Sequence, residues 1–157
     1  MAYQKLQARR ALAVVTDNNI DIPNPAATAA SGTTSAATAS KLTDSSATFL
    51  NDNIKVGDIV YDTTTPAVTT VTAVDSDTVL SVATGIGNTK DYVIYSQTDN
   101  PSNGCVLFAG GAGDIELITV DDDTVLFKGI VAGQFLPVQV KRVKAANTTA
   151  TFIVALW

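Results

Sequence analysis

The sequence predicts an all-β protein, and three observations support this fold class. Residues Gly104 to Trp157 contain at least four apolar runs of β-type residues, separated by turns rich in glycine and aspartate. Residues Thr48 to Ser96 contain four or five shorter runs at the spacing of a small antiparallel barrel or sandwich. The same C-terminal stretch lacks the periodicity of about 3.6 residues that marks an amphipathic helix. Two β blocks therefore account for most of the chain.

Composition limits the chemistry that we expect. The 157 residues include 10 Lys and Arg against 15 Asp and Glu, a formal net charge of -5, with no histidine and one cysteine. The acidic balance argues against a nucleic-acid partner, because phosphate binding needs clustered positive charge. Without histidine there is no imidazole-dependent catalytic triad, and one cysteine can form neither an intramolecular disulfide nor a Cys-based zinc site. We expect no enzyme activity, no cofactor and no metal.

Residues 1–25 are predicted to form an N-terminal arm and a first strand. The start, MAYQKLQARRAL, lacks the apolar run of a secretory signal, and no run approaches the roughly 20 apolar residues that span a bilayer. We therefore expect synthesis in the cytoplasm and no membrane partner. Ala11 to Thr16 is a β-type run, and a polar turn follows at Asp17 to Asn19. An isolated segment of this length is marginal, so the arm should order by packing on another part of the chain, with a frayed terminus as the alternative.

Residues 26–47 are predicted to be a low-complexity linker or surface strap. From Pro23 to Ser46 the chain is almost wholly Ala, Ser, Thr, Gly and Pro. Small side chains bury little apolar area, so packing alone cannot offset the conformational entropy lost on ordering.

Residues 48–98 are predicted to be a compact β unit. The strands are expected within Ile54 to Asp62, Val68 to Asp75, Thr78 to Ala83 and Tyr92 to Ser96. Tyrosines in such strands usually lie in the core or at the rim, but an exposed set could stack on sugars. The candidates for that second role are Tyr61, Tyr92 and Tyr95.

Residues 99–157, which begin with a polar break at Asp99 to Gly104, are predicted to form the C-terminal β domain. The expected strands are Cys105 to Ala109, Asp114 to Val120, Thr124 to Lys128, Gln134 to Lys144 and Thr148 to Trp157. Pro137 lacks an amide hydrogen and should lie at an edge or a bend, while Val143 falls out of phase and indicates a bulge. The turn Asp121 to Asp123 fits a solvated turn better than a calcium loop, because the alternating ligands of that motif are missing.

Basic and aromatic residues near the two ends of the chain are the candidate interface. A basic cluster on the longest predicted strand could contact an acidic neighbour, although an ordinary polar strand face is the simpler interpretation. A tryptophan closing an apolar run indicates a docked C-terminal segment, since termini fray unless they are held. The candidate interface residues are Lys141, Arg142, Lys144, Trp157, Arg9 and Arg10.

Several segments resemble one family of virion proteins. GGAGDIELIT, DTVLFKGIVAGQFLPVQVKRV and NTTATFIVALW, together with the N-terminal ALAVVTDNNIDIP, resemble the head spike base proteins of tailed phages and gene-transfer agents. The resemblance covers about half of the chain. In that family the two pieces lie close together in sequence, so residues from Pro25 to Asn100 would be an insertion, itself similar to β modules of phage structural proteins.

The resemblance implies a small β-sandwich or jelly-roll-like anchoring domain, made from residues 1–25 and 99–157, with a small β-barrel or sandwich unit inserted in it. It also implies a virion location and a symmetric homo-oligomer, with a trimer or pentamer expected. The partners would be the major capsid protein, other virion proteins or a spike fibre. We therefore expect a decoration or cement protein of the capsid exterior, or a vertex spike base. The alternatives are a neck, tail or baseplate component, or a host-glycan-binding module on the virion.

Overall fold

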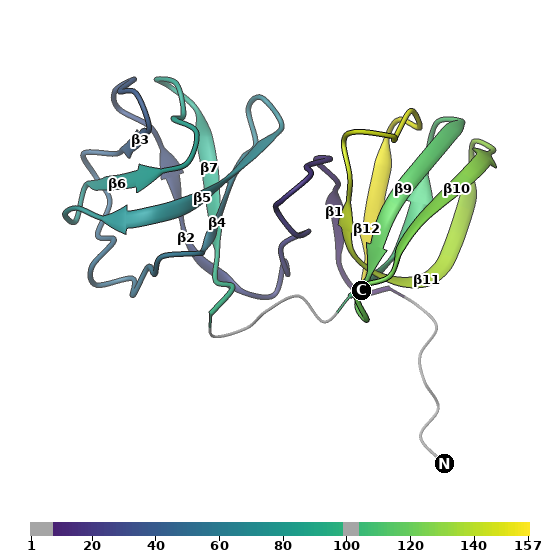
Figure 1. Ribbon diagram of the computed structural model, residues 1–157. Coiled ribbons are helices and arrows are strands. Elements are labelled where there is room, and N and C mark those ends of the chain that lie inside the picture. Colours follow the sequence, from purple (N-terminus) through teal and green to yellow (C-terminus); the bar gives the residue numbers. More distant parts are fainter. Residues whose placement is uncertain (1–7, 99–103) are drawn as a thin grey trace, which may run out of the picture. The chain divides into compact units, whose positions relative to one another are not determined.

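The computed structural model describes residues 8–98 and 104–157, which form twelve strands and no helix (Figure 1). All strand pairings are antiparallel, and the predicted all-β fold is confirmed. Within this described part of the chain, no helix is present that could cross a membrane. The predicted start of the N-terminal arm, residues 1–7, and most of the predicted polar break, residues 99–103, lie outside the described residues.

The chain divides into two compact units. The first combines the segment up to Pro25 with the C-terminal segment, and the second begins at Ala26. The first unit holds one six-stranded sheet in the order β1-β12-β8-β11-β9-β10. Its strands are β1 (Ala11–Ala13), β8 (Cys105–Ala109), β9 (Gly113–Thr119), β10 (Thr124–Ile130), β11 (Gln134–Val143) and β12 (Ile153–Leu156).

The N-terminal segment is part of the first unit's sheet and core. β1 pairs with β12, with Leu12 opposite Ala155, so the expected pairing of the N-terminal strand with the C-terminal block is present. Beyond β1, the amide of Ile22 donates a hydrogen bond of 2.8 Å to the carbonyl oxygen of Lys141. The side chain of Ile22 is buried in the same cluster as Leu107. The segment therefore closes one side of the core that the curled sheet encloses.

Strand β11 departs from regular pairing at two places. Its register with β8 shifts between Leu136 and Val140, the stretch that contains Pro137. Its register with β9 shifts between Val140 and Arg142, just before Val143. The bend predicted at Pro137 and the bulge predicted near Val143 are both found. The bulge restores the inward direction of Val143, which is buried in the core.

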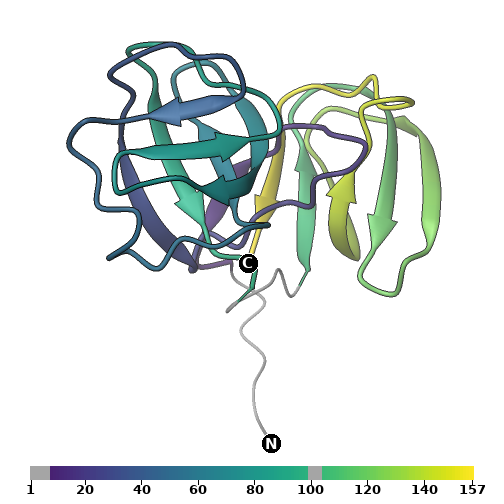
Figure 2. The same ribbon diagram turned by 60° about the vertical axis from the view of Figure 1, so that its left-hand side comes forward.

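The second unit is a six-stranded, barrel-like sheet in the order β2-β7-β4-β5-β6-β3 (Figures 1 and 2). The segment after β2 reaches the other edge of the sheet, where Ala36 bridges Thr43 and the amide of Ser35 donates to the carbonyl oxygen of Thr43. The sheet thus curls around a separate apolar core that includes Phe49 and Leu80. Its strands are β2 (Thr28–Thr33), β3 (Lys41–Thr43), β4 (Ile59–Asp62), β5 (Ala67–Val74), β6 (Val79–Val82) and β7 (Asp91–Tyr95).

The prediction that residues 26–47 form a linker or strap is wrong, because this segment supplies β2 and β3 to the second unit. Backbone pairing of β2 with β7 and of β3 with β6 provides the stabilisation that the small side chains cannot. The packing around β2 also requires a small residue at position 32. A Cβ atom added to Gly32 would overlap the carboxylate of Asp44 and lie 2.8 Å from the hydroxyl oxygen of Tyr92.

Candidate interaction surface

A row of apolar side chains crosses the outer face of the first unit's sheet. Along β8, Leu107 is buried, and Phe108, next to it, points to the opposite face. The register places Phe108 between Phe135 on β11 and Val154 on β12. The rings of Phe108 and Phe135 are 5.1 Å apart at an interplanar angle of 57°. Because Phe135 is still 58% exposed, this face presents aromatic area to solvent.

Phe152 extends this aromatic surface and is held in a strained conformation. Its side chain is 82% exposed, and its backbone has φ of 53°, in the left-handed region that bulky residues rarely adopt. The amide of Gly110 donates a hydrogen bond of 3.0 Å to the carbonyl oxygen of Phe152. Gly110 lies two residues after Phe108, and a Cβ there would point at the Cβ of Phe152, 2.8 Å away. We call Phe108, Phe135 and Phe152 the outer aromatic patch.

The three basic residues predicted at the interface already have acidic partners inside the first unit. The acidic partners come from parts of the chain that are distant in sequence from the basic residues. The pairs are Lys141 with Asp122, Arg142 with Asp21 at 2.7 Å, and Lys144 with Glu116 at 3.2 Å. Their charges are therefore balanced locally, and a contact of these residues with another molecule stays a prediction.

The other predicted interface residues lie beside β1. The amide of Trp157 donates to the carbonyl oxygen of Arg10 at 3.0 Å, and the amide of Arg9 donates back to the carbonyl oxygen of Trp157. The Arg10 guanidinium donates to the carbonyl oxygen of Pro25 at 2.9 Å. The Trp157 ring packs against the first unit's core, with its indole N–H buried and unsatisfied. The C-terminal segment is thus docked within its own unit.

Cys105 is a core residue of the first unit. It is buried, and its thiol lies 3.3 Å from the carbonyl oxygen of Val140. Burial raises the pKa of the Cys105 thiol to about 12. The thiolate that would act as a nucleophile is therefore absent at neutral pH. Elsewhere in the described residues, no group of three or more Cys, Asp or Glu side chains is arranged to hold a metal ion.

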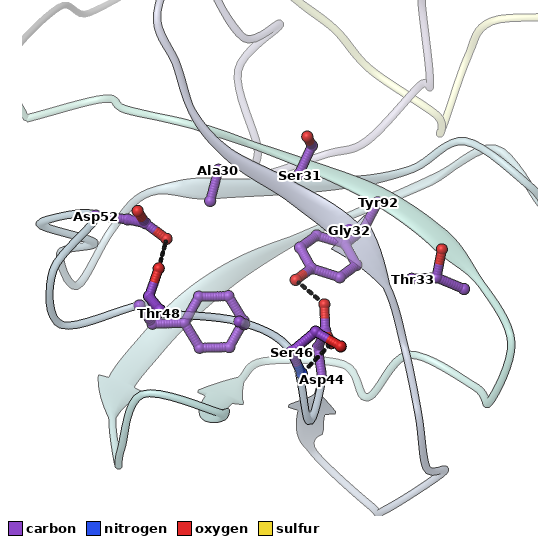
Figure 3. Close-up of a pocket in the computed structure, with 11 residues that line it drawn as sticks. Ala30, Ser31, Gly32, Thr33, Asp44, Ser46, Thr48, Asp52 and Tyr92 are labelled. Atoms are coloured by element: carbon purple, nitrogen blue, oxygen red, sulfur yellow. Dashed lines mark hydrogen bonds between the residues drawn. The ribbon is translucent and has the colours of Figure 1, made fainter.

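The second unit contains a polar cavity of about 400 Å³ between β2 and the segment that follows β3 (Figure 3). At its base, the Tyr92 hydroxyl donates a hydrogen bond of 2.7 Å to the buried carboxylate of Asp44. At its rim, the Thr48 hydroxyl donates to Asp52 at 3.1 Å. β2, from Ala30 to Thr33, and the exposed Ser46 complete the lining. The Ser31 hydroxyl points away from the Asp44–Tyr92 pair, and the Thr33 hydroxyl donates a hydrogen bond of 2.6 Å to the carboxylate of Asp91 (Figure 3).

The three tyrosines considered as sugar-stacking residues are part of the second unit's interior. Tyr61, Tyr92 and Tyr95 are only 4%, 2% and 7% exposed, so no ring face is open to a ligand. The stacking role is therefore wrong for these residues. Tyr92 contacts Phe49 within the core, with ring centroids 6.3 Å apart.

Sequence reasoning missed the outer aromatic patch and the polar cavity. Strand alternation is the signal that could have found part of the patch, because it places Phe108 on the face opposite to the buried Leu107 and Ala109. The cavity had no such signal, because most of its lining residues come from the stretch predicted to be a linker. Comparisons of this chain with protein-family models, with curated proteins and with solved structures found no match.

Proposed function

We propose that this chain is a structural protein of a tailed-phage virion, a decoration or cement protein of the capsid exterior or the base of a vertex spike. It acts by oligomerisation and adhesion and catalyses no reaction. It is made in the cytoplasm of the host bacterium. The observation that carries the proposal is the outer aromatic patch of the first unit. The resemblance of this unit's sequence to head spike base proteins supports the same role.

Aromatic anchors suit adhesion because they contribute large apolar area with little loss of side-chain freedom. Burying one such ring contributes on the order of 2 kcal/mol. Phe135 and Phe152 are 58% and 82% exposed, so a partner surface could bury both rings as anchors at the centre of an interface. The strained backbone of Phe152 also supports an adhesive role, because backbone strain is retained where the surrounding structure holds a residue in place for a function.

Co-sedimentation of the purified chain with purified tailed-phage capsids tests the proposal. The wild-type chain should bind, and Phe135→Ser with Phe152→Ser should weaken binding about tenfold or more. Leu50→Ser and Val56→Ser form the matched control, because these apolar residues are similarly exposed in the second unit. A wild-type chain that binds no capsid, or equal binding by the patch variant, would refute adhesion through this patch.

Position on the particle separates the head assignment from the alternative of a neck, tail or baseplate component. Labelling the chain on assembled particles and locating it by cryo-electron microscopy gives that position. Label on the capsid face or at the vertices supports the proposal. Label confined to the tail structures supports the alternative.

A host-glycan-binding module on the virion is the second candidate function. The observation that favours it is the polar cavity, whose hydroxyl and carboxylate groups match the hydrogen-bonding pattern of a neutral sugar. A glycan array should then show hits that Asp52→Asn abolishes, while Thr72→Val, an exposed threonine on β5 outside the cavity, leaves them unchanged. An array without hits for the wild-type chain would count against this function.

A further inference from the structure

Strand β10 is a free edge of the first unit's sheet. It pairs only with β9, and no other strand of the described chain lies on its outer side. The amide of Thr119 donates to the carbonyl oxygen of Asp123, and the amide of Lys144 donates to the carbonyl oxygen of Glu116, opposite Leu126. Backbone groups alternate along a strand, so those of Thr124, Leu126 and Lys128 point away from the sheet.

This edge is open over most of its length. Val125 and Leu126 are each 38% exposed, in a strand otherwise well formed. Proteins usually protect such edges with bulges or inward-pointing charges. Here the register irregularity comes only after Phe127, so the preceding residues keep a regular strand. From Thr124 to Phe127 the edge carries neither device and has apolar side chains, so this part is a template for another strand.

The charges beside this edge are self-complementary. Lys128 at one end of β10 forms no ion pair within the part of the chain that the structure describes. Asp121 and Asp123, in the turn before β10, form none there either, whereas Asp122 pairs with Lys141. An antiparallel arrangement of two copies would bring the lysine end of each strand to the acidic end of the other.

We infer that β10 pairs antiparallel with β10 of a second copy of this chain, about a two-fold axis at Leu126. A two-fold axis perpendicular to the sheet keeps each face on the same side in both copies. Opposite residues of an antiparallel pair point to the same face, so one residue on the axis must lie opposite its own copy. Leu126 is the outward-facing residue nearest the middle of the regular segment. Val125 then lies opposite Phe127 of the second copy, and Lys128 lies next to the second copy's acidic turn.

The pairing joins two curled sheets into one continuous sheet. Val125 and Phe127 are on the core side of β10, opposite Leu117 and Ile115 of β9. Their pairing would extend the apolar core across the axis and cover the exposed part of Val125. The contact joins copies two at a time, so it predicts a dimer of the isolated protein, in place of the trimer or pentamer that the family resemblance implies. This inference goes beyond the proposed virion role and does not rest on it.

Sedimentation equilibrium of the full chain tests the pairing. The wild-type chain should be a dimer. Lys128→Glu alone, and Asp121→Lys with Asp123→Lys alone, should each weaken dimerisation about tenfold or more, because like charges then face each other. An equimolar mixture of the two variants should restore a dimer, because both contacts become complementary again. A monomeric wild-type chain, or a mixture that stays monomeric, would overturn the pairing.

A backbone substitution provides a second, independent readout. Leu126→Pro removes an amide hydrogen that faces outward, so it should leave the β9–β10 hairpin folded and abolish the dimer. Val125→Pro is its control, because that amide faces β9 and its loss should lower the melting temperature. If Leu126→Pro melts like the wild type and stays dimeric, the interface lies elsewhere. Loss of the dimer with capsid binding retained would separate this contact from the aromatic patch.

Discussion

At the scale of single residues, the second unit depends on a glycine that leaves room for a buried hydrogen bond. Gly32 lies against the Asp44–Tyr92 pair, and an added Cβ would occupy the space of both polar atoms. The sequence could not identify this role, because Ala, Ser and Gly in succession are equally typical of a linker. Gly32 differs from a linker glycine in its contact with Asp44 and Tyr92, and these two residues come close to it only in the folded sheet.

Gly32→Ala is expected to destabilise the second unit by about 1–3 kcal/mol, because the new methyl group must displace the Asp44 carboxylate or the Tyr92 ring. Chemical denaturation measures the change. Gly87→Ala is the matched control, since a Cβ there meets only the side chain of Lys90 at 3.7 Å. Equal stability of the two variants would contradict the close packing at Gly32.

Tyr92 should make the second unit sensitive to alkaline pH. Burial, and then the hydrogen bond to Asp44, raise the pKa of Tyr92 above its ordinary value. A group with a raised pKa in the folded state contributes stability that is full below its unfolded pKa, about 10, and is lost as the pH rises above it. Urea unfolding at increasing pH should show this loss, and Tyr92→Phe should show a shallower one. Parallel pH profiles for the two proteins would rule out this contribution.

The basic residues of the predicted interface show a similar limit of sequence reasoning. Lys141, Arg142 and Lys144 stand out by local density, yet their partners come from distant segments. Arg142, for example, meets Asp21, 121 positions away. A local charge pattern predicts that a strand is basic but not whether the fold balances those charges.

At the scale of elements, the segment after β1 stabilises the sheet that it completes. Ile22 is buried among side chains of β8 and β11, although it lies far from them in sequence. Ile22→Ala should therefore cost about 2–5 kcal/mol, the usual range for truncating a core aliphatic residue. The melting temperature of the first unit measures this loss.

A matched substitution outside the core should have little effect. Leu50→Ala changes an exposed aliphatic side chain in the second unit and should alter stability by less than about 0.5 kcal/mol. Similar melting temperatures for Ile22→Ala and Leu50→Ala would show that the N-terminal segment does not contribute to the core.

Strands with alternating apolar residues were predictable, and those without them were not. The five expected C-terminal strands are all present. Val74 to Leu80 (VDSDTVL) and Val120 to Leu126 (VDDDTVL) match at six of seven positions, and each leads from one strand of an antiparallel hairpin into the next. β2 and β3 were missed because most of their side chains are small or polar, and backbone pairing holds much of both strands in place, although Leu42 on β3 is fully buried. Hydrophobic patterns report side-chain burial, so an element held by its backbone leaves little trace in the sequence.

At the scale of the whole molecule, each unit has its own apolar core. Deleting Ala26 to Pro101 and joining the flanking segments through a short Gly/Ser linker should leave the first unit folded. Circular dichroism should show a β spectrum and a cooperative thermal transition. The separate second unit provides the complementary measurement, and a first unit that unfolds without the second would disprove this independence.

The pairing of β1 with β12 also determines how the first unit responds to mechanical load. Ala11 lies opposite Leu156, so tension applied outward from these two residues opens the β1–β12 ladder one hydrogen bond at a time, and the strands peel apart at low force. A force applied at Cys105 along the direction of β8 is resisted more strongly, because β8 is hydrogen-bonded to β12 on one side and to β11 on the other. All of those hydrogen bonds are then loaded together in shear. The first unit therefore yields readily at its β1 edge and resists pulling through β8.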